Sequence, residues 1–100
     1  MNAEKIRGAI GLCRRAGKVT VGITLVKEQL HKGKAALVLL AADAAKNTEE
    51  RILPLAEHKA VPVRRIPLTK KELALAVGKS TEAVCVSIPK EFVNLVLASL

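Results

Sequence analysis

Aromatic side chains are nearly absent from this chain of 100 residues, which has one phenylalanine, Phe92, and no tryptophan or tyrosine. Proteins that read single-stranded nucleic acid usually stack the bases on aromatic side chains. The chain lacks such a platform. If it binds nucleic acid, we expect it to recognise backbone and shape.

Long hydrophobic runs are also missing, although half of the residues are hydrophobic. The longest unbroken apolar run, Ala35 to Ala42, is far shorter than the ~20 residues that a membrane-spanning helix needs. Glu4, Lys5 and Arg7 place charges where a signal peptide would have its apolar core. We therefore expect a cytoplasmic protein with no membrane partner, folded as a single domain over residues 1–100.

The side-chain groupings that carry catalysis are not found either. Cys13 and Cys85 stand far apart among apolar neighbours, which predicts buried free thiols and no metal site. Neither GxGxxG nor GxxxxGK[ST] occurs, so a nucleotide would lack its usual cradle. Asp43 follows the apolar run LVLLAA, but without a nearby histidine or cysteine it is interpreted as a turn or cap residue. We predict no catalytic residue, metal or cofactor.

Positive charge is plentiful and unevenly placed. The chain carries 17 Lys and Arg residues against 9 Asp and Glu, a net charge of +8. Residues 1–34 hold eight of the cations but only Glu4 and Glu28, so most of the excess lies in the first third. This asymmetry favours a polyanion-binding face. The alternative is a solvated basic surface without a partner.

The hydrophobic periodicity predicts helices and strands in alternation. Asn2 is the expected N-cap of the first helix and Gly17 its stop, and TKKE at Thr69–Glu72 is a capping box. Pro54 should lie near the start of its helix, and Phe92, Val93, Val96 and Leu97 of the last helix should face inward. The expected order is helix 3–16, strand 19–21, helix 22–32, strand 36–41, a helix opening at 47–50, strand 61–66, helix 73–77, strand 83–88 and a helix after Pro89.

This alternation predicts an α/β fold. We expect a three-layer α/β/α sandwich around a four-stranded mixed, mostly parallel sheet. Periodicity alone does not give the strand order.

The turn at Gly22 is the best candidate for a binding site. Glycine lets a partner's backbone approach closely, and the helix that follows offers free N–H groups and a positive end, which suit a phosphate. Ile23, Val26 and Leu30 form the core stripe of that helix, which puts Leu25 on the solvent side. The alternative is that Leu25 belongs to the core.

The stretch GKVTVGITLVKEQLHKGKAALVLLAADA resembles the ribosomal protein L7Ae family of kink-turn RNA binders, in particular its short bacterial branch of YlxQ type. The similarity extends over most of the chain. RRAGK at Arg14–Lys18, Gly22, KGKAALVLLAADA at Lys32–Ala44 and the segment Gly78–Ile88 all fall in register. The resemblance implies the alternating three-layer fold and the binding of structured RNA without catalysis, often in ribonucleoprotein particles.

The resemblance also implies the RNA-binding residues. One contact is the turn and the start of the second helix, comprising Gly22, Ile23, Thr24, Leu25, Lys27 and Glu28. The other is the loop after the fourth helix, comprising Gly78, Lys79, Ser80 and Thr81. Phosphate contacts are expected from Arg14, Arg15, Lys18, Lys27, Lys32 and Lys34.

Thr24 and Leu25 occupy the positions at which well-known kink-turn binders carry Asn and Glu, and Glu28 replaces a lysine. Because leucine cannot hydrogen-bond a base edge, the base readout should be altered. We expect a non-catalytic protein that docks on structured, kink-turn-like RNA, with ribosomal RNA as the first candidate and other ribosomal proteins or translation factors as further partners. The alternative is a protein-interaction module, accessory to translation factors, that uses Leu25. A small-molecule enzyme ranks third.

Overall fold

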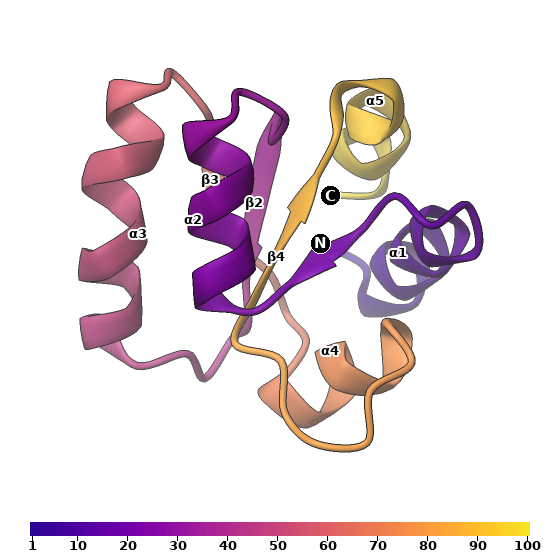
Figure 1. Ribbon diagram of the computed structural model, residues 1–100. Coiled ribbons are helices and arrows are strands. Elements are labelled where there is room, and N and C mark those ends of the chain that lie inside the picture. Colours follow the sequence, from indigo (N-terminus) through magenta and orange to yellow (C-terminus); the bar gives the residue numbers. More distant parts are fainter.

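The computed structural model describes residues 1–100, and five helices enclose one four-stranded sheet (Figure 1). The elements are α1 (Ala3–Arg15), β1 (Thr20–Val21), α2 (Ile23–His31), β2 (Leu37–Leu40), α3 (Lys46–His58), β3 (Val63–Arg65), α4 (Lys70–Ala76), β4 (Cys85–Ile88) and α5 (Lys90–Ser99).

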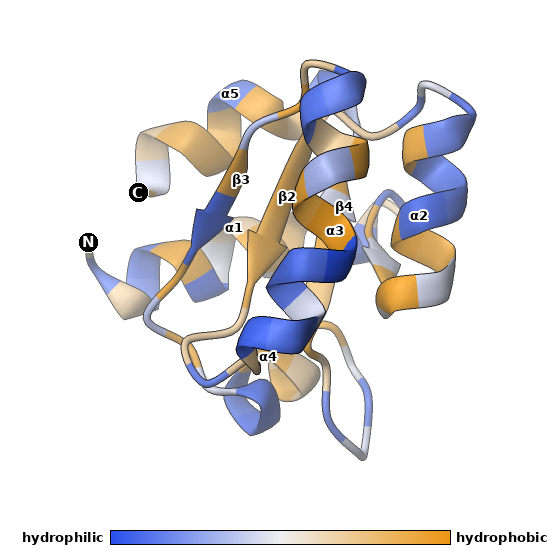
Figure 2. Cartoon of the chain, turned by 90° about the vertical axis from the view of Figure 1, so that its left-hand side faces the viewer, coloured by the Kyte–Doolittle hydropathy of each residue, from blue (hydrophilic) through white to orange (hydrophobic).

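The helices form two layers, one on each face of the sheet. Helices α2 and α3 pack together on one face, while α1 contacts α4 and α5 on the other (Figure 1). This arrangement confirms the predicted three-layer α/β/α sandwich. In Figure 2, β2 is hydrophobic along its length, and α2 and α3 show mixed surfaces with hydrophilic residues outward. No helix is both long enough and apolar enough to cross a membrane.

The sheet is mixed, but the prediction that it is mostly parallel is wrong. The strand order is β1-β4-β2-β3, and only β2 and β3 pair in parallel. Strand β4 lies between β1 and β2 and runs antiparallel to both. The reason is the short helix α4, which does not carry the chain back along the sheet. The chain therefore re-enters the sheet from the end at which β2 and β3 finish.

The core is built around the two central strands, whose residues are all buried. From α1, Ile6, Ile10 and Cys13 are fully enclosed. Both cysteines are buried free thiols, as predicted. Burial raises the pKa of the Cys85 thiol to about 11 because the thiolate would lose its hydration.

The predicted caps of two helices are confirmed. The Asn2 side chain accepts hydrogen bonds from the Glu4 and Lys5 N–H groups at the start of α1. At the start of α4, the Thr69 hydroxyl accepts from the Glu72 N–H, and the Glu72 carboxylate accepts from the Thr69 N–H. These bonds satisfy donors that a helix N-terminus otherwise leaves free.

Two predictions about helices are wrong. Pro54 lies well inside α3, which begins at Lys46 and continues past the proline to His58. Leu97 is 40% exposed, because α5 packs on the core through Phe92, Val93 and Val96, and the next position on that stripe is Leu100.

Arg65 fixes the loop between β2 and α3, a role that the sequence pattern did not reveal. Its guanidinium donates to the carbonyl oxygens of Ala41, Ala42 and Ala44 at 3.0, 3.1 and 3.0 Å. It also donates to the Glu49 carboxylate at 2.9 Å. One side chain on the edge strand therefore holds the loop at the carboxyl end of β2.

Leu25 lies on the solvent side of α2, as the helical periodicity predicted. It is 51% exposed, whereas Val26 and Leu30 are fully buried. Ile23 is half-buried and packs against the core. The alternative that Leu25 is a core residue is thereby excluded.

The two leucines of α2 make a matched pair for a stability test. Leu25→Ala should change the free energy of unfolding by no more than about 0.5 kcal/mol, because an exposed side chain loses little buried area. Leu30→Ala should cost about 2–5 kcal/mol through lost burial and the cavity left behind. Urea unfolding followed by circular dichroism measures both. Equal losses for the two variants would contradict the placement of Leu25.

Candidate nucleic-acid interface

Gly22 joins β1 to α2 in a conformation that requires glycine. Its φ of 94° and ψ of 155° lie in a region essentially closed to residues with a Cβ. The Gly22 N–H donates to the Cys85 carbonyl oxygen at 3.0 Å, which ties the turn to the start of β4. No atom lies within 4 Å of the position that a Cβ would occupy. The turn is therefore rigidly held and open on its outer side.

The N-terminus of α2 has no side-chain cap and no acidic residue in its first turn. The first intrahelical hydrogen bond runs from the Val26 N–H to the Gly22 carbonyl oxygen at 2.9 Å. The N–H groups before Val26 thus point outward at the positive end of the helix, beside the exposed side chains of Thr24 and Leu25. This end of α2 can accept an anion.

A shallow hollow of about 500 Å³ lies between α2 and α3 next to this helix end. Its lining includes Thr24 and Lys27 of α2 and Arg51 of α3. Sequence reasoning missed Arg51, because nothing in the pattern of α3 showed that this arginine would face α2. Arg51 therefore places a second cation, in addition to Lys27, near the first turns of α2.

Glu28 and Lys32 neutralise each other on the outer face of α2. The Lys32 Nζ donates to the Glu28 carboxylate at 2.8 Å, one helical turn apart. This hydrogen bond and the charge of Lys32 hold the pKa of the Glu28 carboxyl below its usual range. Lys27 and Arg51 take part in no ion pair and keep their full charge for a partner.

The loop between α4 and β4 begins with a glycine that closes the helix. Gly78 has a φ of 72°, and the Lys79 N–H donates to the Ala74 carbonyl oxygen at 2.8 Å. The Arg14 guanidinium occupies the space that a Cβ at position 78 would need. The C-terminal part of α1 thus places a cation directly on this loop, next to the exposed residues Lys79, Ser80 and Thr81.

The Gly22 turn and the α4–β4 loop lie at the same end of the sheet (Figure 1). The hydrogen bond from Gly22 to Cys85 joins the end of β1 to the start of β4, and the Ala41 N–H donates to the Val84 carbonyl oxygen at 2.9 Å. The two segments that the family resemblance implicated are therefore brought to one end of the molecule.

Asp43 lies at this end as well, where it caps α4. Its Oδ1 atom accepts a hydrogen bond from the Lys70 N–H at 2.8 Å. The interpretation as a turn or cap residue is confirmed. No group of His, Cys, Asp and Glu side chains in the structure could hold a metal ion.

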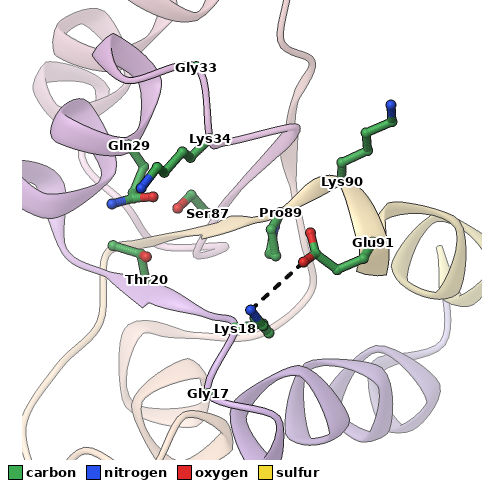
Figure 3. A pocket seen from close by; sticks show the side chains of 10 residues that line it. All are labelled: Gly17, Lys18, Thr20, Gln29, Gly33, Lys34, Ser87, Pro89, Lys90 and Glu91. Atoms are coloured by element: carbon green, nitrogen blue, oxygen red, sulfur yellow. Dashed lines mark ion pairs between the residues drawn. The ribbon is translucent and has the colours of Figure 1, made fainter.

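The basic residues expected to contact phosphate do not form one cluster. Lys18 and Lys34 line a separate polar pocket at the C-terminal end of α2 (Figure 3). Arg15 lies in the groove between α1 and α4. Of these basic residues, Lys27 and the ion-paired Lys32 lie beside the hollow at the Gly22 turn, and Arg14 lies on the α4–β4 loop.

Relatives of the chain include bacterial RNA-binding proteins. The chain is 30% identical over 91 residues to the RNA-binding protein YlxQ of Bacillus subtilis (strain 168), covering 91% of this chain and 90% of the relative. It is 31% identical over 78 residues to the RNA-binding protein YlxQ of Enterococcus faecium, covering 78% and 75%.

Solved structures share the whole fold. A protein of unknown function from Bacillus halodurans C superposes with a TM-score of 0.86 at 25% identity, covering 98% of this chain and 97% of that one. The 15.5kD RNA binding protein of Giardia lamblia superposes with a TM-score of 0.81 at 25% identity, covering 99% and 87%.

A family match accounts for both sets of similarities. It extends over residues 4–95, from the first turn of α1 into α5, and so includes every strand and both segments at the Gly22 end of the sheet. The chain belongs to the Ribosomal protein L7Ae/L30e/S12e/Gadd45 family.

Proposed function

We propose that the chain is a non-catalytic RNA-binding protein that docks on folded, kink-turn-like RNA through the N-terminus of α2 and the α4–β4 loop. The observation that carries this proposal is the uncapped, outward-facing N-terminus of α2, held beside that loop by the hydrogen bond from Gly22 to Cys85. The RNA-binding relatives of the same family support it.

The proposed docking depends mainly on contacts to the RNA backbone. The free N–H groups after Gly22 and the positive end of α2 hold one phosphate. Lys27, Arg51, Arg14 and Lys79 supply cations on either side of it, and backbone contacts of this kind fix position without reading sequence. The ion-paired Glu28 and Lys32 add little net charge, because each offsets the other.

The two exposed side chains in the first turn of α2, Thr24 and Leu25, would contact the bases. The Thr24 hydroxyl can donate or accept one hydrogen bond, and Leu25 offers only apolar contact. The protein therefore recognises the shape of a widened groove more than the edges of particular bases. Its readout differs from that of family members that carry Asn and Glu at these positions.

We place this activity in the cytoplasm, on ribosomal RNA, with the whole chain acting as one RNA-binding domain. The ribosomal proteins that give the family its name support this setting. Other ribosomal proteins or translation factors are expected neighbours on such an RNA.

A second candidate function is a protein-interaction module accessory to translation factors. The exposed leucines favour it, with Leu75 at 76% exposure and Leu25 at 51%. It ranks below RNA binding because the surface around Leu25 also presents the open N-terminus of α2 and two unpaired cations.

The salt dependence of RNA binding tests the cations of the proposed face. Lys27→Gln combined with Lys79→Gln should flatten the slope of log K against log salt by about two units, since each lost phosphate contact releases one counterion fewer. The measurement is fluorescence anisotropy with a folded RNA between low and physiological salt.

The matched control is Lys5→Gln combined with Arg64→Gln, which removes the same charge from α1 and from the edge strand β3. This pair should leave the slope nearly unchanged. If both pairs flatten the slope equally, the protein binds RNA through a diffuse basic surface and the proposed face is wrong.

Restoring the kink-turn side chains tests the altered readout. Thr24→Asn combined with Leu25→Glu supplies base-edge hydrogen bonds on a backbone already in place. Because a good base-edge pair contributes about 1–3 kcal/mol in DNA, affinity for a standard kink-turn RNA should rise about tenfold or more. Calorimetric titration of the kink-turn RNA and of a plain duplex gives both affinities.

The plain duplex is the internal control. Its affinity should stay level or fall, because the new glutamate repels phosphate. Glu28→Lys should add to the gain on the kink turn. Tight kink-turn binding by the unmodified protein, or no gain in the double variant, would show that Thr24 and Leu25 do not occupy the base-reading positions.

A further inference from the structure

A second polar cavity lies away from the Gly22 turn, at the C-terminal end of α2 (Figure 3). Its volume is about 440 Å³, and Pro89 is the only apolar side chain that lines it. We call it the Ser87 pocket. Its polar side chains come from α2, β1, β4, the first turn of α5 and the connections between them, and they are Lys18, Thr20, Gln29, Lys34, Ser87, Lys90 and Glu91.

Ser87 is the least expected of these side chains, because it lies in the centre of the sheet. It pairs with Thr20 of β1 on one side and with Val38 of β2 on the other. The residue is only 2% exposed, and its hydroxyl takes part in no side-chain hydrogen bond.

Every polar side-chain atom that is sealed from solvent has a hydrogen-bond partner in the structure. The Ser87 hydroxyl has no such partner, so it is not fully sealed from solvent. Its small accessible surface faces the pocket, into which the side chain points in Figure 3. Because a buried hydroxyl without a partner costs free energy, the pocket offers a donor and acceptor that a ligand can satisfy.

Three lysines surround the pocket from three different segments. Only Lys18 has a carboxylate partner, Glu91, at 3.9 Å between Nζ and Oε2. The charges of Lys34 and Lys90 remain uncompensated, which leaves two positive charges in excess. A phosphate monoester carries up to two negative charges near neutral pH.

The backbone holds Lys34 in place at the rim. The Lys34 N–H donates to the Gln29 carbonyl oxygen at 2.9 Å, and the Ala36 N–H donates to the Ile88 carbonyl oxygen at 2.8 Å. The connection from α2 to β2 is thus anchored on both sides of the lysine, and its stem starts from a fixed point.

The N-terminus of α5 opens onto the same pocket. Pro89 is its N-cap residue, and no side chain caps the helix, which is ten residues long. Its positive end and the first free N–H groups add to the attraction for an anion. Thr20 and Gln29 provide hydroxyl and amide groups nearby, which suit the hydroxyls of a sugar.

We propose that the Ser87 pocket binds a phosphate group attached to a hydroxyl-rich sugar. Both the RNA backbone, a phosphodiester with one negative charge per phosphate, and free sugar phosphates, monoesters with up to two, present a phosphate on a sugar. No aromatic side chain lines the pocket, so a nucleobase would find no stacking partner there. The inference does not depend on the proposed RNA face, since the pocket shares no residue with the hollow beside Thr24.

Titration with ribose 5-phosphate, followed by the amide ¹H–¹⁵N NMR signals of the protein, tests the site. The signals of Thr20, Lys34, Ser87 and Lys90 should shift and saturate. Ribose alone and sodium chloride at matched ionic strength should not reproduce these shifts. Absence of saturation, or the same shifts with chloride, would overturn the proposal.

Variants of the protein distinguish binding in the Ser87 pocket from non-specific attraction to surface charge. Lys34→Gln should weaken binding about tenfold or more, since it removes a charge-assisted hydrogen bond, and Ser87→Ala about two- to tenfold, since it removes a neutral one. Ser87→Ala deletes a hydroxyl without a partner, so the variant should fold, and its spectrum shows whether it does. Arg64→Gln on β3 is the matched control. Wild-type affinity in both pocket variants would also refute the site.

A second titration, with folded RNA, distinguishes the two sources of the phosphate. If the RNA backbone fills the pocket, ribose 5-phosphate competes with RNA and Lys34→Gln lowers RNA affinity. If a free sugar phosphate is the ligand, neither affects RNA binding. The first titration contains no RNA, so its result is independent of whether the proposed RNA face is correct.

Discussion

The hydrogen bond from the Gly22 N–H to the Cys85 carbonyl oxygen is the contact on which the functional end of this protein depends. It joins the last residue before α2 to the first residue of β4. The start of α2 and the end of the α4–β4 loop are therefore fixed relative to each other by one backbone bond. The unusual φ of 94° at Gly22 turns the chain outward at this point, so the N–H groups of α2 face solvent and not the core.

The direction of β4 makes this arrangement possible. A fully parallel sheet would begin β4 at the opposite end, and the loop before it would lie far from Gly22. Because β4 runs against its neighbours, its start meets the end of β1. The same pairing places Ser87 opposite Thr20 at the other end of β1, beside the N-terminus of α5. Strand β4 thus contributes to both polar sites of the molecule.

Local features of the fold were predictable from the sequence because they depend on neighbouring residues. The Asn2 cap, the Thr69 capping box and the solvent position of Leu25 follow from spacing along one helix. The direction of β4 was not predictable, because it depends on how the short α4 lies across the end of the sheet.

The residues of the candidate sites were also predictable only where the signal is local in the sequence. The glycine turn at Gly22 has a local signal. Arg51, Arg65 and Ser87 act through contacts with residues that are distant in sequence, and no spacing reveals them. Charge counting identified an N-terminal excess of cations, but it could not show that Arg14 of α1 and Lys18 of the α1–β1 connection lie at different sites.

The most direct test of the central claim is a map of the RNA contacts on the labelled protein. Folded RNA titrated into the ¹⁵N-labelled chain should perturb most strongly the amide signals from Gly22 to Glu28 and from Gly78 to Thr81. Signals from β3 and from the C-terminal half of α5 should stay in place. If the strongest perturbations fall on β3, or on the groove between α1 and α4, the N-terminus of α2 is not the RNA-binding face.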